Sequence, residues 1–297
     1  MPEALLALLP DRGVVSVTGP DARSFLDNLI TNDMTLLDSQ EAIHAGLLSP
    51  QGKILFAFFV VKTPAGFLLE AALDQSAALA KRLSLYKLRA KIEIKDAPGE
   101  VIVAASFGDV RARPLGAIAF VDPRAGQLGD RLLLPATAVG DLVANTAARR
   151  MSPDFVAARR IALGVPEDGS DYPLGDTFPH EADFDLFHGV SFAKGCYVGQ
   201  EVVARMQNKT VVRKRVLRVS GTDLLTSGAE VKVGEAVIGR VGSVAGNQGL
   251  AMLRLDRVVE AIDKGPAITA GGIALTIDAE MLARYRRSVA EKAAVGL

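Results

Sequence analysis

The chain has 297 residues, of which 49% are hydrophobic and 23% charged, and its 34 basic and 34 acidic residues leave no formal net charge. This length is enough for two or three domains, each with its own core. A neutral balance argues against broad electrostatic affinity for nucleic acid or an anionic membrane. We therefore expect small-molecule or protein partners, with no direct nucleic-acid partner and no membrane.

The chain contains a single cysteine and so cannot form an internal disulfide. This fits a reducing compartment, and we expect a cytoplasmic location. The opening MPEALLALLPDRG has an early glutamate and no basic region, which favours a short amphipathic helix over a secretory signal. The longest apolar run, residues 54–61, is too short to cross a bilayer.

The first part of the chain alternates between strand and helix patterns. A strand at 14–17 precedes Gly19-Pro20-Asp21, which signals the start of a helix with one apolar face. Turns with proline and glycine separate the next strands, and Asp96-Ala97-Pro98-Gly99 marks a boundary. We expect a first α+β lobe over residues 1–98, with further strands at 45–48, 54–61, 67–70 and 92–94 and helices at 22–30 and 74–88.

A second α+β lobe is expected over residues 99–215, with strands at 101–105, 116–121 and 131–134 and a helix at 137–148. Ser152-Pro153-Asp154 begins another helix, which Gly164 ends. Short strands at 216–219, 230–233, 236–241, 250–255 and 273–277 then predict a small barrel or sandwich over residues 216–280. Residues 281–297 form a basic, alanine-rich tail that could be helical.

The segment Lys194-Gly195-Cys196-Tyr197-Val198-Gly199-Gln200-Glu201 carries the only cysteine. Lys194 is a cation beside the thiol, and cations lower a thiol pKa. The flanking glycines leave the backbone free to bend. A free cysteine is, however, often a buried apolar residue. We predict a functional thiol, with Cys196 and Lys194 as candidate catalytic residues.

This motif, together with Arg160-x-x-x-Gly164-Val165-Pro166 and Pro179-His180-Glu181, closely resembles the YgfZ-type proteins, folate-binding relatives of the glycine-cleavage T protein. Ser49-Pro50-Gln51-Gly52-Lys53 also resembles the first lobe of that family, so the resemblance covers nearly the whole chain. It implies two lobes of the aminomethyltransferase type and a C-terminal antiparallel β-barrel in a ring-like arrangement. It also implies tetrahydrofolate, or a one-carbon derivative, as the cofactor in the central channel.

The resemblance suggests roles for individual residues. Asp171 falls where the relatives place a carboxylate that grips the pterin ring, seven positions past Gly164, although a turn residue is an equally good interpretation of the sequence alone. Asn32 resembles a position that lines the channel, or is a helix C-cap. A third group of cofactor-binding candidates comprises Tyr197, Glu201, Arg205 and Arg215. Among these, Arg215 could meet the glutamate tail of folate together with Arg213 and Lys214, whereas Glu201 and Arg205 could pair on a helical turn.

Two functions remain open at this point. The resemblance implies a factor for assembly or repair of iron-sulfur clusters in client enzymes, with an indirect effect on tRNA modification and with iron-sulfur client or assembly proteins as partners. The alternative is a tetrahydrofolate-dependent aminomethyl or one-carbon transferase acting on an amine. Leu55-Phe56 stands where the glycine-cleavage enzymes carry an acidic pair, which leaves no evident general acid or base there.

Three further observations complete the sequence-based prediction. Direct tRNA binding through residues 213–218 is disfavoured by the neutral charge and the scarce aromatic residues. Lys209-Thr210 replaces a family Arg-Gly pair, so the conformation of that loop is open. The three histidines lack a metal-ligand spacing, and we predict no tightly bound metal.

Overall fold

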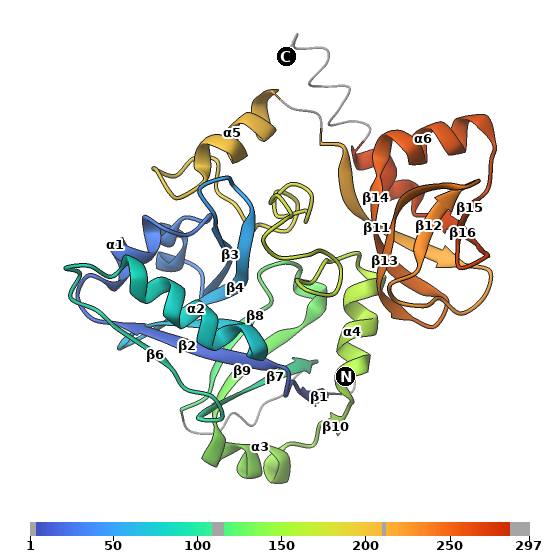
Figure 1. Cartoon of the computed structure of the whole chain (residues 1–297). Helices are drawn as coiled ribbons and strands as arrows, with labels where there is room; N and C mark the ends of the chain where they lie inside the picture. Colours follow the sequence, from blue (N-terminus) through green and yellow to red (C-terminus); the bar gives the residue numbers. More distant parts are fainter. Residues whose placement is uncertain (1–3, 109–115, 210–211, 286–297) are drawn as a thin grey trace. The chain divides into compact units, whose positions relative to one another are not determined.

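The computed structural model describes residues 4–108, 116–209 and 212–285, and its contacts divide the chain into two compact units (Figure 1). Unit 1 comprises Met1–Leu48, Leu55–Val156 and Phe187–Val198. Unit 2 comprises Ser49–Ile54, Ala157–Leu186 and Gly199–Leu297. The domain limits expected from the sequence, including the 98/99 and 215/216 boundaries, stay a prediction.

Unit 1 contains a five-stranded sheet with the strand order β3-β4-β5-β2-β6. In β4 the side chains alternate between two cores, because Phe56 and Phe58 face one core and Phe59 faces the other. Both faces are therefore buried at β3 and β4, which explains why these two strands are largely apolar. The strands are β2 (Arg12–Thr18), β3 (Ala42–Leu48), β4 (Ile54–Thr63), β5 (Gly66–Ala72) and β6 (Glu93–Asp96).

The second sheet of unit 1 has the order β10-β1-β7-β9-β8. Its strand β1 (Leu5–Leu8) corrects the expectation of an N-terminal amphipathic helix. This segment pairs antiparallel with β7 and parallel with β10, and pairing over such a distance in the chain outweighs the helical pattern of a few residues. The remaining strands are β7 (Val101–Phe107), β8 (Ile118–Val121), β9 (Asp130–Pro135) and β10 (Arg149–Arg150).

The two sheets of unit 1 pack face to face, and helices cover their outer faces. Val14 and Phe59 of one sheet meet Val103 and Leu133 of the other in a shared core. The opposite face of the first sheet packs against Leu79 and Leu83 of α2 (Leu73–Tyr86), as the periodicity of that helix predicts. The other helices are α1 (Ala22–Asp27), η1 (Met34–Asp38), η2 (Gly126–Leu128), η3 (Ala136–Ala138) and α3 (Val139–Asn145).

Unit 2 contains a closed barrel with the order β11-β14-β13-β12-β15-β16, drawn in orange and red in Figure 1. Its strand pairs are antiparallel, and the α+β class with a C-terminal antiparallel β-barrel is thereby confirmed. The strands are β11 (Lys214–Gly221), β12 (Glu230–Val233), β13 (Ala236–Ala245), β14 (Gln248–Arg254), β15 (Ile268–Ala270) and β16 (Ile273–Ile277).

Three described helices lie in unit 2 or at its border with unit 1 in the sequence. The helix α4 (Pro153–Ala162) ends before Gly164, whose φ of +71° suits glycine, as predicted. The helix α5 (Gln200–Lys209) begins inside the cysteine motif. The helix α6 (Leu255–Lys264) and strand β15 are absent from the sequence-based prediction.

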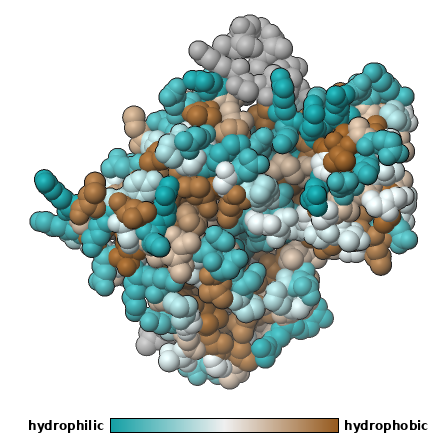
Figure 2. All heavy atoms as spheres, viewed as in Figure 1, coloured by the Kyte–Doolittle hydropathy of each residue, from teal (hydrophilic) through white to brown (hydrophobic). Residues whose placement is uncertain are grey.

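The surface carries both kinds of side chain, and Figure 2 shows hydrophilic and hydrophobic ones interspersed over the face drawn. In the part of the chain that the structure describes, no helix combines the length and apolarity needed to span a membrane.

Candidate functional site

The motif cysteine lies on an irregular stretch of unit 1, Phe187–Val198, which we name the thiol segment. Hydrogen bonds fasten this segment to the turn that follows α1. The hydroxyl of Thr31 donates to the carbonyl of Gly189 at 2.6 Å. The amide of Ser191 donates to the carbonyl of Thr31 at 3.0 Å. The segment therefore has a defined path without regular secondary structure of its own.

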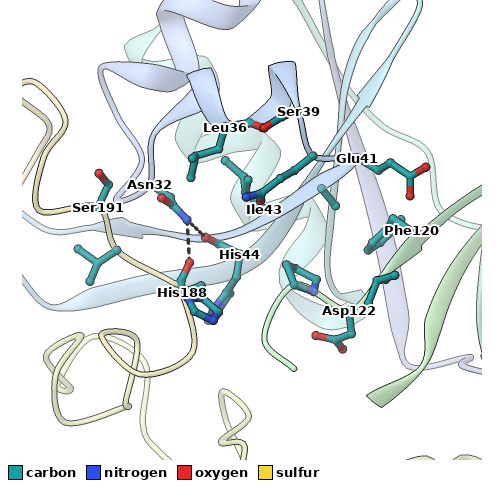
Figure 3. Close-up of a pocket in the computed structure, with 15 residues that line it drawn as sticks. Asn32, Leu36, Ser39, Glu41, Ile43, His44, Phe120, Asp122, His188 and Ser191 are labelled. Carbon is teal, nitrogen blue, oxygen red and sulfur yellow. Dashed lines mark hydrogen bonds between the residues drawn. The ribbon is translucent and has the colours of Figure 1, made fainter. Parts of the chain in front are cut away.

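Asn32 ties the thiol segment to β3 through its side chain. Its Nδ2 donates to the carbonyls of His44 and His188, each at 2.7 Å (Figure 3). Its Oδ1 accepts the amide of Asp33 at 2.9 Å, and only 4% of the residue is exposed. Asn32 thus lies beyond the end of α1 at Asp27, where it holds two backbone segments together.

Lys194 reaches from the thiol segment to the same turn. Its ammonium donates to the carbonyls of Asp27, Ile30 and Asn32 at 2.6, 3.0 and 2.8 Å, and the carboxylate of Asp27 lies at 3.2 Å. Asp27 is the last residue of α1, and a cation near the C-terminal carbonyls of a helix is favourable. Burial lowers the pKa of Lys194 although Asp27 opposes the shift. The predicted activation of the thiol by Lys194 stays a prediction, since these contacts are with backbone and Asp27.

Cys196 is exposed, and so is the neighbouring Gly195, around which a Cβ would meet open space. Tyr197 is only 8% exposed, and burial raises its pKa to about 12. The Nζ of Lys194 lies 5.4 Å from the centre of the Tyr197 ring, within the range of a cation–π contact. The thiol is accordingly presented to solvent between two anchored side chains.

A cavity of about 810 Å³ lies in unit 1 beside the thiol segment. Figure 3 shows Asn32, His44 and His188 on one side of it and Phe120 and Asp122 on the other. The size suits a drug-sized molecule or cofactor. The lining residues are Asn32, Leu36, Ser39, Gln40, Glu41, Ala42, Ile43, His44, Phe120, Val121, Asp122, Pro123, His188, Val190 and Ser191.

His44 is held in its neutral form at the wall of the cavity. Burial lowers its pKa to about 4, and the charge of Arg124 contributes in the same direction. Nδ1 lies 3.0 Å from the carbonyl of Phe187, an acceptor, so Nδ1 carries the proton and Nε2 the lone pair. The ring meets Phe59 edge-on at a centroid distance of 5.9 Å. His44 therefore brings a neutral polar group to a wall that mixes polar and apolar side chains.

Asp122 connects the cavity to a buried ionic network between the two sheets. Both of its oxygens accept from Arg124, at 3.0 and 2.8 Å, and one also accepts from Arg131 at 3.4 Å. Burial opposes its ionisation, but the two arginines outweigh burial and hold the pKa of Asp122 well below its usual range. Arg131 continues to Glu70 at 3.5 Å, and Glu70 pairs with Arg12 at 2.9 Å. Asp122 is therefore a fixed negative group at the cavity.

Glu201 and Arg205 belong to α5 in unit 2. Their side chains form the predicted (i, i+4) ion pair at 2.9 Å, which confirms the pairing on a helical turn. Both side chains are largely exposed, at 85% and 64%, so the pair contributes little stability. Their predicted contact with a cofactor stays a prediction.

Asp171 is enclosed in unit 2. One oxygen accepts from Arg160 at 2.6 Å and from the amide of Glu167 at 2.9 Å, and the other accepts from the amide of Ser243 at 2.7 Å. The side chain has no exposed surface. These protein donors satisfy both oxygens of the carboxylate within the fold. The contact of Asp171 with a pterin ring that the resemblance implies stays a prediction.

Arg215 is similarly engaged within unit 2. Its guanidinium donates to Asp183 at 2.9 Å and to both oxygens of Asp185 at 2.6 and 2.7 Å, and it stacks on Tyr285 at 4.9 Å. Only 4% of the residue is exposed. The neighbouring Arg213 and Lys214 are exposed, and the predicted recognition of a folate tail by these three residues stays a prediction.

The structure brings Asn32, Lys194, Tyr197 and Cys196 together in unit 1, whereas the other four predicted site residues belong to unit 2. Sequence reasoning missed Asp122 and set His44 and His188 aside because no metal-ligand spacing links the histidines. The available signal at His44 was a single ionisable residue within a fully buried apolar strand. In the described part of the chain, no cluster of three or more His, Cys, Asp or Glu side chains could hold a metal ion.

The barrel and the whole fold have known counterparts. Residues 213–281 match the family described as CAF17, C-terminal beta-barrel domain, and this range contains all six barrel strands. The whole chain is similar in fold to the aminomethyltransferase T of the glycine cleavage system from Bartonella henselae. That similarity has a TM-score of 0.73 at 17% sequence identity and covers 93% of this chain and 85% of the other. It confirms the aminomethyltransferase-like fold.

Several curated proteins are similar in sequence. The chain is 33% identical over 296 residues to the mitochondrial iron-sulfur cluster assembly factor IBA57 of Homo sapiens, with 87% of this chain and 78% of that protein covered. It is 35% and 33% identical to the mitochondrial IBA57 homologs of Mycosarcoma maydis and Neurospora crassa, over 72% and 71% of this chain. The chain spans little more than half of those two fungal proteins, 57% and 52% of their lengths.

These relatives correct one prediction and refine another. All three are named as mitochondrial proteins, which contradicts the predicted cytoplasmic location. The YgfZ-type resemblance is compatible with them but describes a neighbouring group. Because the identity to the human protein extends over more than two thirds of that protein, the chain belongs to the IBA57 family of iron-sulfur cluster assembly factors.

Proposed function

We propose that this chain supports the assembly or repair of iron-sulfur clusters in client enzymes and that it binds tetrahydrofolate in this role. The observation that carries the proposal is the 33% identity to the human iron-sulfur cluster assembly factor over 78% of its length. The aminomethyltransferase-like fold and the cavity beside the thiol segment support the choice of a folate. An effect on tRNA modification would be indirect, through client enzymes that contain clusters.

The cavity suits the pterin ring of a folate better than its glutamate tail. The carboxylate of Glu41, an exposed residue, is the kind of acceptor that pairs with the amino and amide edge of a pterin. The other acidic lining residue, Asp122, is paired with Arg124 and Arg131, so among the described lining residues Glu41 is the carboxylate that would repel an anionic tail. Tetrahydrofolate would supply a carrier for a one-carbon unit, while Asn32 and His44 shape the wall that orients it.

Cys196 is the group that would meet the iron-sulfur cargo. It is exposed and it is the only thiol of the chain. Thiolates are the usual protein ligands of iron-sulfur clusters, and a single thiolate cannot hold a cluster alone. An iron-sulfur assembly or client protein would therefore supply the remaining ligands.

Complementation tests this function. In cells that lack their own member of the family, the wild-type chain should restore the activity of a four-iron enzyme under oxidative stress. Cys196→Ala should fail to restore it, while Thr222→Ala, an exposed substitution in unit 2, should behave as wild type. Failure of the wild-type chain would refute the proposed function, and full rescue by Cys196→Ala would refute the role of the thiol.

A titration with 5-formyltetrahydrofolate tests the cofactor separately. Binding should weaken in Glu41→Gln, which removes an exposed carboxylate at the cavity, and should persist in Thr222→Ala. If Asp171→Asn abolishes binding while Glu41→Gln does not, the folate lies elsewhere than in this cavity.

Transfer of a one-carbon unit to an amine is the alternative function. The fold similarity to an aminomethyltransferase is compatible with it, but that similarity at 17% identity concerns the fold. Leu55 and Phe56 pack into the core of unit 1, so the strand where the glycine-cleavage enzymes carry acidic residues offers no carboxylate. Turnover of methylene or methyl donors by the purified chain would favour this alternative.

A further inference from the structure

Lys194 occupies a special place between the cavity and the thiol. It lies two residues before Cys196, yet its ammonium is buried, with 1% of the side chain exposed. Its donors are directed at the backbone carbonyls of Asp27, Ile30 and Asn32. The side chain of Lys194 therefore points into the protein, toward the turn after α1, although its neighbour Cys196 is exposed.

The turn that Lys194 holds also forms part of the cavity wall. Asn32 lines the cavity, accepts from Lys194 through its carbonyl, and donates through its amide to His44 and His188. His188, Val190 and Ser191 of the thiol segment line the same cavity. A ligand in the cavity would consequently touch both the turn and the near end of the thiol segment.

The thiol segment is fastened at separate points along its length. Thr31 binds it at Gly189 and Ser191, and Lys194 binds it three residues further on. Beyond Lys194 the backbone at Gly195 is exposed with open space around it. Lys194 is therefore the last of these anchors before the thiol, and loss of it would leave Cys196 attached through Tyr197 on one side alone.

We propose that Lys194 is a positioning residue that transmits occupancy of the cavity to Cys196, by tying the thiol segment to the turn that carries Asn32. A bound ligand stabilises the turn and the segment together, and Lys194 extends that stabilisation to the exposed thiol. Coupling of this kind is reciprocal, so a partner that holds the thiol also raises the affinity of the cavity for its ligand. The inference rests on the proposed function in one respect, namely that the cavity takes a ligand.

The single cysteine makes a direct test possible. A nitroxide attached to Cys196 reports the motion of the thiol segment alone, because the chain has no other thiol. The labelled wild type, Lys194→Met and the control Lys95→Met are compared with and without 5-formyltetrahydrofolate. Lys95 pairs with Glu100 at the surface of the same unit, with 54% of its side chain exposed.

We expect the ligand to immobilise the label in wild type and in Lys95→Met. In Lys194→Met the label should already be about twofold more mobile without ligand, on the nanosecond scale that a nitroxide senses, and should no longer respond to ligand. Equal mobility of wild type and Lys194→Met, with the same ligand response, would overturn the inference.

Two further arms separate the possible failures. Thr31→Val removes the hydroxyl that donates to Gly189 and accepts from the amide of Gly46, and it should loosen the label in the same direction if Lys194→Met does not fold. If 5-formyltetrahydrofolate does not bind wild type, the proposed cofactor is wrong, whereas the ligand-free mobilities still decide whether Lys194 positions the thiol. A thiol reactivity whose pH midpoint rises in Lys194→Met, at unchanged mobility, would show electrostatic activation and refute positioning.

Discussion

Replacement of Asp171 separates the role that its family resemblance implies from the role that its contacts give it. Asp171→Ala removes the acceptor of Arg160 and of the amides of Glu167 and Ser243, all within unit 2. Arg160 is 5% exposed in its side chain and keeps Glu167 as an ion-pair partner at 3.2 Å. Breaking a buried ion pair costs about 3–5 kcal/mol. Because Arg160 keeps Glu167, we expect the free energy of unfolding to fall by an amount near the lower end of this range, about 3 kcal/mol.

Urea unfolding and hydrogen–deuterium exchange measure this loss. The amide of Ser243 in β13 should exchange faster in Asp171→Ala, because the carboxylate that accepts from it is gone. The control Glu230→Ala removes an exposed carboxylate from the neighbouring β12, whose pair with Lys232 contributes at most about 1 kcal/mol. A second variant, Gly242→Ala, should act like Asp171→Ala, since its Cβ would lie 2.5 Å from the Asp171 carboxylate.

The result that would refute this reasoning is specific. If Asp171→Ala unfolds at the urea concentration of wild type, keeps the Ser243 amide protected and loses affinity for 5-formyltetrahydrofolate, then Asp171 is a ligand-binding residue. The structural role assigned from its contacts would then be wrong, and the role implied by the family resemblance would stand.

Three further predictions concern stability. Burial lowers the pKa of His44 from 6.5 to about 4, so the unfolded chain takes up the His44 proton at a higher pH than the folded chain does. The free energy of unfolding of unit 1 should therefore fall by up to about 3 kcal/mol as the pH is lowered from 6.5 to 4. Unfolding curves of His44→Gln should lack this loss. Gly239→Ala should destabilise the barrel by roughly 1–3 kcal/mol, because a Cβ there would lie 2.0 Å from the carbonyl oxygen of Met252. Gly140→Ala in α3 would place its Cβ near no atom within 4 Å and should stabilise the protein by about 0.5–1 kcal/mol. Thermal unfolding measures both variants, and equal effects would contradict the predicted clash at Gly239. Arg205→Ala should change the unfolding free energy by less than about 1 kcal/mol, so a loss of complementation at unchanged stability would place a partner or ligand contact at α5.

Local sequence patterns determined most of the secondary structure. The alternation in β4 and the spacing of Leu79 and Leu83 in α2 reflect burial on one or two faces, which is a local property of the chain. The local pattern gave the wrong secondary structure for Leu5–Leu8, because this segment forms a strand by pairing with residues 104–107 and 149–150. The strand β15 was missed for the same reason, since its three residues are specified by pairing in the barrel.

The candidate site shows the same division. Residue identity alone identified a solitary cysteine among glycines and cations, and the structure shows that thiol exposed. Sequence could not show that Lys194 turns toward the carbonyls after α1, because those partners lie more than 160 positions earlier in the chain. Nor could it show Asp122 and His44 at one cavity, since they come from strands and loops that only the packing of the two sheets brings together.

The sequence by itself determined a resemblance to a neighbouring group of the family, the α+β class and the single thiol on which the proposed chemistry depends. Tertiary structure decided which polar groups serve the fold and which face a cavity, as Asp171 and Arg215 illustrate by their buried ion pairs. The physical reason is that hydrogen-bond partners and burial set the role of an ionisable side chain, and both are properties of residues distant in sequence.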